Sequence, residues 1–130
     1  MMRADVIAYL ERAGAVPFAW GVSDCVQLAA GMVELARGVP SMLPAYSSEL
    51  EAKRALVALG GLERAVSAAL GPMQRDRRLC VDGDIVLAAF EGQQALGVAV
   101  PRVFYLRRNG GGLIPVDMTL AIGFWPCRSS

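Results

Sequence analysis

A cysteine at the predicted head of a helix is the first place in this sequence where chemistry is expected. Residues 18–25 read FAWGVSDC, and an apolar-periodic run, residues 26–37, follows. Asp24 is a good N-cap because its carboxylate accepts from the free N–H groups of a first helical turn. Cys25 would then open the helix, where the positive end of the helix dipole favours a thiolate. The alternative is a buried structural cysteine that behaves as a small apolar group.

The chain has no histidine, and this limits what such a thiol can do. A histidine general base, a histidine metal ligand and a histidine pH switch are all excluded. The three cysteines are odd in number, far apart and without a Cys-x-x-Cys pair. This pattern indicates neither a disulfide framework nor a zinc site. We therefore expect free thiols in a reducing compartment, no metal and no cofactor.

Other side chains offer poor substitutes for a histidine base. A carboxylate beside Cys25 would oppose the thiolate through like charge. Asp24 is better explained as a helix cap, and Asp82 and Asp84 as turn residues. Asp117 is a further carboxylate that the sequence leaves as a candidate. Three more proton-exchanging side chains are conceivable, although no spacing recommends them: Tyr46, Lys53 and Tyr105.

Composition and charge favour one folded domain over residues 1–130. The chain is 55% hydrophobic and 19% charged, with a net charge of +1, so no strong field attracts nucleic acid or anionic lipid. No apolar run approaches the roughly 18 residues of a membrane span, and the N-terminal pattern is not that of a secretory signal. We interpret two arginine clusters as solvated loop charge: residues 75–78 and the pair Arg107–Arg108.

The periodicity predicts an α+β domain, with helices first and strands second. Helices are expected over residues 5–12, 25–37, 62–70, and from a capping box at Ser48 to Gly60. Short strands are expected over residues 85–90, 95–100, 103–107, 113–116 and 122–125. The helical half, about residues 1–72, would cover one face of an antiparallel sheet or small barrel formed by about residues 80–127.

The aromatic pair near the end of the chain has two interpretations. Phe124 and Trp125 fall in the last predicted strand. They either pin that strand to the core or form an exposed anchor for a partner subunit.

Three motifs, in this order and spacing, resemble the NlpC-type branch of the papain-fold cell-wall peptidases. They are Phe18-x-Trp20-Gly21-x-x-Asp24-Cys25, Gly83-Asp84-Ile85-Val86 and Leu96-Gly97-Val98. The resemblance implies a papain-like α+β fold in which Cys25 holds the nucleophile position. It also implies that Ala95 stands where the peptidases carry their histidine base. An alanine can neither stabilise a thiolate nor protonate a leaving group.

The strand Ala95-Leu96-Gly97-Val98 is similar to that of small histidine-less proteins encoded among phage and prophage tail genes. This resemblance implies a non-catalytic structural component of a tail tip or baseplate. Its expected partners are hub, distal tail or tape-measure proteins. We expect it in the virion tail, assembled in the host cytoplasm.

Two other functions remain open from the sequence. The first is an active cysteine hydrolase that cuts peptidoglycan during DNA entry, with Cys25 as the nucleophile. The second is a module that binds peptidoglycan peptides without turnover, in a cleft lined by Phe18, Trp20 and Trp125. These aromatic residues are otherwise ordinary core residues.

Overall fold

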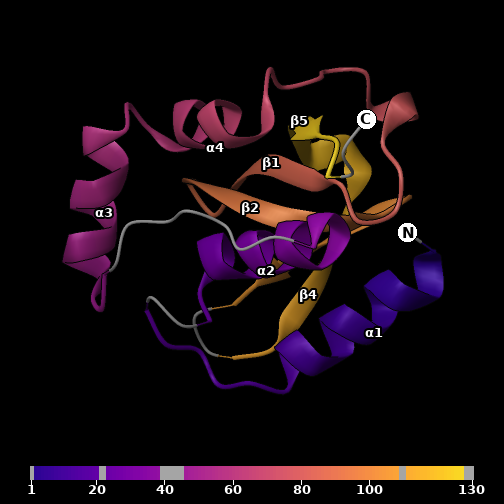
Figure 1. Cartoon of the computed structure of the whole chain (residues 1–130), viewed down its shortest axis with the longest axis horizontal. Coiled ribbons are helices and arrows are strands. Elements are labelled where there is room, and N and C mark those ends of the chain that lie inside the picture. The colour runs from indigo at the N-terminus through magenta and orange to yellow at the C-terminus, as the bar shows by residue number, and fades with distance from the viewer. Residues whose placement is uncertain (1, 21–22, 39–45, 109–110, 128–130) are drawn as a thin grey trace.

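The computed structural model describes residues 2–20, 23–38, 46–108 and 111–127, and it has helices first and strands second (Figure 1). The helices are α1 (Arg3–Gly14), α2 (Cys25–Arg37), α3 (Glu49–Ala58) and α4 (Leu62–Leu70). The strands are β1 (Ile85–Phe90), β2 (Gln93–Val100), β3 (Val103–Arg107), β4 (Leu113–Asp117) and β5 (Ala121–Trp125). The α+β class predicted from the periodicity is confirmed.

Capping residues set both ends of α2 and the start of α3 where the sequence predicts them, whereas α3 ends at Ala58 and not at the predicted Gly60. The Asp24 carboxylate accepts from the N–H of Gln27 at 3.0 Å and begins α2. Gly38 ends this helix in the left-handed region, at φ 72°, which a glycine adopts without strain. The Ser48 hydroxyl accepts from the N–H of Glu51 at 3.2 Å and begins α3. Helix α1 is longer than the predicted 5–12 by two residues at each end.

The strands form one antiparallel sheet with the order β4-β3-β2-β1-β5. β1 is the link between the β2–β3–β4 meander and β5, because it pairs with both β2 and β5. Within the described residues, β4 and β5 have no strand on their outer sides, so the sheet is open and not a closed barrel. Gly97 lets β2 approach β3, since a Cβ there would lie 2.8 Å from the carbonyl oxygen of Tyr105.

Both faces of the sheet carry a core. Helix α2 crosses β2 (Figure 1), and its Leu28 and Met32 are buried with Leu87 and Leu96 on the helix-facing side. Tyr105 is partly buried against this core. The opposite face carries a second apolar cluster, which the sequence does not predict: Cys80, Val86, Ala88, Ala99, Phe104, Leu106, Val116, Met118 and Phe124.

Phe124 and Trp125 are core anchors, which decides between their two interpretations. Both are buried, and they lie on opposite faces of the sheet because successive strand residues alternate. The indole N–H of Trp125 donates to the Ser67 hydroxyl at 3.1 Å, which fixes α4 to β5. No helix in the described ranges has both the length and the apolar character that crossing a membrane requires.

Candidate functional site

Cys25 occupies the head of α2 as predicted, but its electrostatic surroundings favour the thiol. Burial raises the pKa of the Cys25 thiol most, and the charge of Asp24 raises it further. The backbone N–H groups of Leu96, Cys25 and Val26 lower it, in the direction expected for a helix terminus. The net pKa is nevertheless raised, so the expectation that this position favours a thiolate is wrong. At neutral pH the sulfur therefore carries its proton.

The structure brings the head of α2 next to the strand that would carry a histidine. The backbone N–H of Leu96, the neighbour of Ala95 in β2, acts on the Cys25 thiol and lowers its pKa. Ala95 itself is half-buried and packs against the second apolar cluster, whereas Leu96 is in the helix-facing core. Ala95, where the resemblance places the histidine, therefore does not face Cys25, and β2 contains no acid–base side chain that could.

Asp24 is a structural carboxylate that also holds a tyrosine. It is 1% exposed, and its Oδ1 atom accepts from the Gln27 N–H at 3.0 Å and from the Tyr46 hydroxyl at 2.9 Å. Burial raises the pKa of Tyr46, and the bond to Asp24 raises it further. Tyr46 is therefore a fixed proton donor to Asp24 and not a base for Cys25. No sequence spacing pointed to this contact, because Asp24 and Tyr46 lie 22 residues apart.

The aromatic residues before Cys25 contact each other. The rings of Phe18 and Trp20 meet edge to face, with centroids 5.1 Å apart and an interplanar angle of 87°. Both are half-buried, and neither lines the large apolar groove that α2, α3 and α4 border. The third aromatic residue of the predicted cleft, Trp125, is in the core. Gly21, the remaining residue of the motif, lies outside the described residues.

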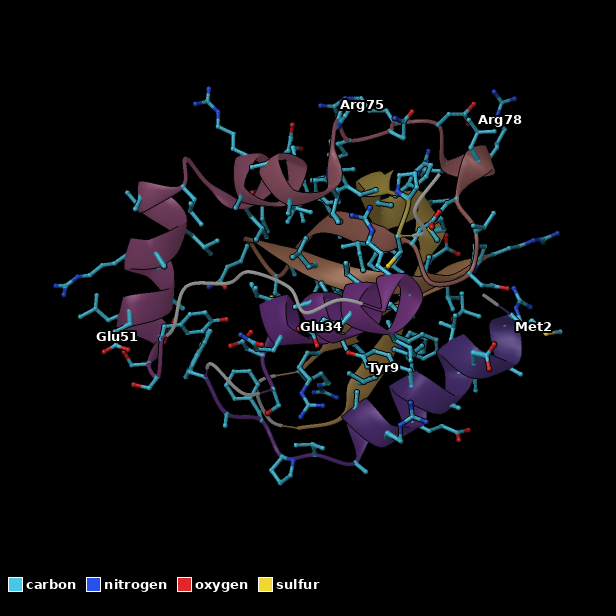
Figure 2. All side chains as sticks on the ribbon, viewed as in Figure 1. Met2, Tyr9, Glu34, Glu51, Arg75 and Arg78 are labelled. Atoms are coloured by element: carbon cyan, nitrogen blue, oxygen red, sulfur yellow. The ribbon has the colours of Figure 1, made fainter. Side chains whose placement is uncertain are left out.

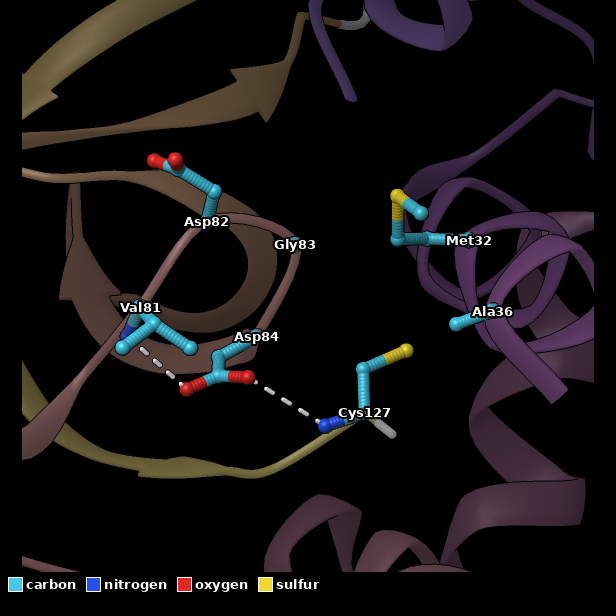
Figure 3. Close-up of a pocket in the computed structure, with 7 residues that line it drawn as sticks. All are labelled: Met32, Ala36, Val81, Asp82, Gly83, Asp84 and Cys127. Carbon is cyan, nitrogen blue, oxygen red and sulfur yellow. Dashed lines mark hydrogen bonds between the residues drawn. The ribbon is translucent and has the colours of Figure 1, made fainter. Parts of the chain in front are cut away.

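The second motif is a turn at the other end of α2 (Figure 3). Asp84 is 2% exposed; its Oδ2 accepts from the Val81 N–H at 3.0 Å and its Oδ1 from the Cys127 N–H at 3.3 Å. Gly83 has a φ of 89°, and a Cβ there would lie 3.2 Å from a methyl carbon of Val6. Asp84 therefore fixes the turn to the C-terminal segment, beside Met32, and is no partner for Cys25.

The other two cysteines, Cys80 and Cys127, are buried free thiols, and both lie close enough to Asp84 to feel its charge. Burial raises the pKa of Cys80 to about 12 and that of Cys127 to about 11, and the charge of Asp84 contributes to both shifts. Cys25 is a free thiol as well. In the described part of the chain, no cluster of His, Cys, Asp or Glu side chains could hold a metal ion.

The remaining proton-exchanging candidates are engaged away from the head of α2. Asp82 pairs with Arg3, with 3.1 Å between carboxylate oxygen and guanidinium nitrogen. Lys53 pairs with Glu49 at 3.0 Å on the exposed face of α3. Asp117 caps the short helical turn after β4. None of these groups contributes to the shift of the Cys25 pKa.

The two arginine clusters have different surroundings. Arginines within residues 75–78 are exposed, and Arg75 and Arg78 point away from the fold (Figure 2), which confirms these two as solvated charge. Arg77 instead donates to the carbonyl oxygens of Met118 and Thr119. Arg107 is 8% exposed, so its assignment as solvated loop charge is wrong. Its Nη1 donates to the carbonyl oxygen of Ala13 at 2.5 Å, and its Nη2 to that of Val16. As the last residue of β3, Arg107 joins the sheet to the chain after α1.

A large apolar groove lies between α2, α3, α4 and the strands β1 and β2. Its volume is about 640 Å³. Alanine, valine and leucine side chains from the three helices line it, together with Ile85 and Leu96, and the Tyr46 hydroxyl is the polar group in its wall. No local pattern predicts this groove, because the position of α3 relative to α2 cannot be read from either helix alone.

The fold and site define an α+β protein with a helix-head cysteine and, in the described part of the chain, no acid–base partner at that thiol. The chain belongs to the family described as Domain of unknown function (DUF6950), whose model matches residues 2–127. No curated protein matches the chain.

Proposed function

We propose that this chain is a non-catalytic structural component of a phage tail tip or baseplate, built on a papain-like, NlpC-type domain. The observation that carries the non-catalytic part of the proposal is the raised pKa of the Cys25 thiol beside β2, a strand without any acid–base side chain. General acid–base help contributes about 100- to 10,000-fold to a rate. A protonated thiol without that help is a poor nucleophile.

The tail assignment rests on the resemblance of residues 18–25 and 95–98 to histidine-less tail-gene proteins. The apolar groove between α2, α3 and α4 supports an assembly role, since large exposed apolar surfaces are commonly covered by partners. Hub, distal tail and tape-measure proteins are the partners that we propose.

Phage particles test the proposal most directly. Three genomes would be compared: wild type, one with the gene deleted, and one encoding Cys25→Ala. We expect mass spectrometry to detect the chain in purified tails. We also expect the deletion to abolish infectious particles, and Cys25→Ala to leave the infectious titre unchanged. Absence of the chain from purified tails would contradict the structural role, and a Cys25→Ala titre as low as the deletion would contradict the non-catalytic one.

An active cysteine hydrolase of peptidoglycan is the second candidate. The observation that favours it is that the backbone N–H groups of Leu96, Cys25 and Val26 lower the pKa of the Cys25 thiol, the direction that stabilises a thiolate nucleophile. Solubilisation of peptidoglycan by the wild type, lost in Cys25→Ala and kept in Cys80→Ala, would establish this activity. We expect no solubilisation by any of the three proteins.

A further inference from the structure

A pocket beside the head of α2 contains a buried guanidinium group. Its volume is about 280 Å³, and it lies between α1, the chain that follows it, the first turns of α2 and the end of β3. Ser23 and Gln27, which flank the Asp24–Cys25 pair, line one side. The other lining residues are Tyr9, Arg12, Ala13, Val16, Leu28 and Arg107.

Arg107 has more hydrogen-bond donors than partners. A guanidinium carries five N–H groups, and the bonds to Ala13 and Val16 use two of them. The Nε atom is buried and has no partner among the described residues. No carboxylate there forms an ion pair with Arg107 either. Burying a charge is costly unless an opposite charge or a full set of hydrogen bonds compensates it.

The wall of this pocket is positively charged. Arg12 is an exposed second guanidinium, and none of the lining residues is acidic. Tyr9 points from α1 toward α2 (Figure 2), and its hydroxyl donates to the carbonyl oxygen of Leu28 at 2.6 Å. Burial and the charge of Glu34, which is not a lining residue, raise the pKa of Tyr9 to about 12, whereas both arginines lower it. The phenol therefore adds no negative charge at neutral pH.

We propose that this pocket binds a carboxylate attached to a short apolar body, such as the C-terminal residue of a peptide. The planar guanidinium of Arg107 can donate to the two oxygens of a carboxylate, and Arg12 adds a second positive charge to the pocket wall. The aliphatic side chains of Ala13, Val16 and Leu28 provide the contact surface for the body. The volume is close to the lower end of the usual range for ligand pockets, which favours a small ligand. The proposal does not depend on whether Cys25 reacts or whether the chain belongs to a tail.

Calorimetric titration of the full chain with three probes tests the site. The probes are 4-methylpentanoate, its uncharged amide 4-methylpentanamide, and inorganic phosphate. We expect the carboxylate to bind about tenfold more tightly than the amide, because the amide lacks the charge-assisted bonds. We also expect it to bind more tightly than phosphate, which lacks the apolar body.

Matched variants locate the binding. Arg12→Gln removes an exposed charge of the wall, and we expect about threefold weaker carboxylate binding. Arg108→Gln removes the neighbouring cation outside the pocket and is expected to change nothing. Arg107→Lys keeps the charge but loses the fork, and about tenfold weaker binding is expected. If Arg107→Lys does not fold, the difference in carboxylate binding between Arg12→Gln and Arg108→Gln decides whether the pocket is the binding site.

Four outcomes would overturn the proposal. They are no heat of binding with the carboxylate, equal binding of the amide, phosphate binding as tight as that of the carboxylate, and equal losses in Arg12→Gln and Arg108→Gln. Equal losses would indicate long-range attraction to net charge and not a site.

Discussion

At each end of α2 a cysteine lies near a buried aspartate: Cys25 near Asp24, and Cys127 near Asp84. The two cysteines differ in the groups that lower the pKa of the thiol. At the first end, backbone N–H groups of Leu96, Cys25 and Val26 act on the Cys25 thiol and lower its pKa. At the other end, the Arg37 guanidinium is the group that lowers the pKa of Cys127. In both places burial is the largest effect, and the nearby aspartate adds to it. Cys25 is half-buried, and a helix terminus is therefore insufficient to activate a thiol desolvated to this extent beside a carboxylate.

The two aspartates also differ in what they hold together. Asp24 joins a helix terminus to Tyr46, within 22 residues of chain. Asp84 joins the turn before β1 to the segment after β5, and so connects the first and last segments of the strand half. The contact made by Asp84 spans 43 residues. We therefore expect the structure to depend more on Asp84 than on Asp24.

Substitution of Asp84 is expected to have the largest effect. Asp84→Ala leaves the buried N–H group of Cys127 and the part-buried N–H group of Val81 without their acceptor, so the free energy of unfolding should fall by about 2–4 kcal/mol. Urea unfolding followed by circular dichroism measures the change. Asp82→Ala, two residues away and paired with Arg3 at the surface, should cost less than about 1 kcal/mol. Equal losses in the two variants would remove Asp84 from its structural role.

Two substitutions of Asp24 separate its role as a helix cap from the effect of its negative charge on Cys25. Asp24→Asn keeps a good capping side chain, whereas Asp24→Ala removes the cap and should destabilise by about 1–2 kcal/mol. Asp24→Asn should lower the pKa of Cys25 and leave that of Cys127 unchanged, since the negative charge disappears only from the first end of α2. Thiol alkylation against pH, resolved by peptide mass spectrometry, measures the pKa values of Cys25 and Cys127 in Asp24→Asn. A Cys25 pKa unchanged by Asp24→Asn would contradict the electrostatic assignment.

The raised thiol pKa values also predict how stability changes with pH. Burial raises the pKa of Cys127 from 9.0 to about 11, so the unfolded chain loses this proton at lower pH than the folded one. Stability from this group is complete below about pH 9 and is lost as the pH rises toward 11. We expect the fall in unfolding free energy over this window to be shallower in Cys127→Ala. An identical slope in wild type and variant would show that Cys127 does not titrate as assigned.

The smallest effect is expected at Lys53. It pairs with Glu49 on the exposed face of α3. Lys53→Ala should therefore change the free energy of unfolding by less than about 0.5 kcal/mol, and it should leave the alkylation rate of Cys25 unchanged. Chemical denaturation and the same alkylation assay measure the two quantities. A slower alkylation of Cys25 in this variant would reinstate Lys53 as a group that acts on the thiol.

The sequence predicts most of the secondary structure because the signals are local. Asp24, Gly38 and Ser48 determine helix ends through their own side chains or backbone freedom. The strand segments follow from short apolar runs between turn residues, and the predicted ranges lie within two residues of the observed strands. These signals require no knowledge of tertiary contacts.

The surroundings of the candidate site depend on tertiary contacts and could not be predicted. Arg107 is adjacent to Arg108 in sequence, but the alternation of β3 turns only Arg107 toward α1. The contact between Tyr46 and Asp24 joins residues 22 positions apart, and local patterns do not specify it. The raised pKa of Cys25 follows from burial, which depends on how α2 packs against β2. The apolar groove depends in the same way on where α3 lies.

The alkylation rate of Cys25 against pH, with Cys80 and Cys127 as internal references, decides whether Cys25 is a protonated structural thiol or an activated nucleophile. If burial and Asp24 keep the thiol protonated, Cys25 should titrate above the usual value of about 8.5 for a free cysteine and react slowly at pH 7. If instead Cys25 titrates several units below that value and reacts much faster than the other two thiols, its sulfur is an activated nucleophile. That result would contradict the non-catalytic assignment.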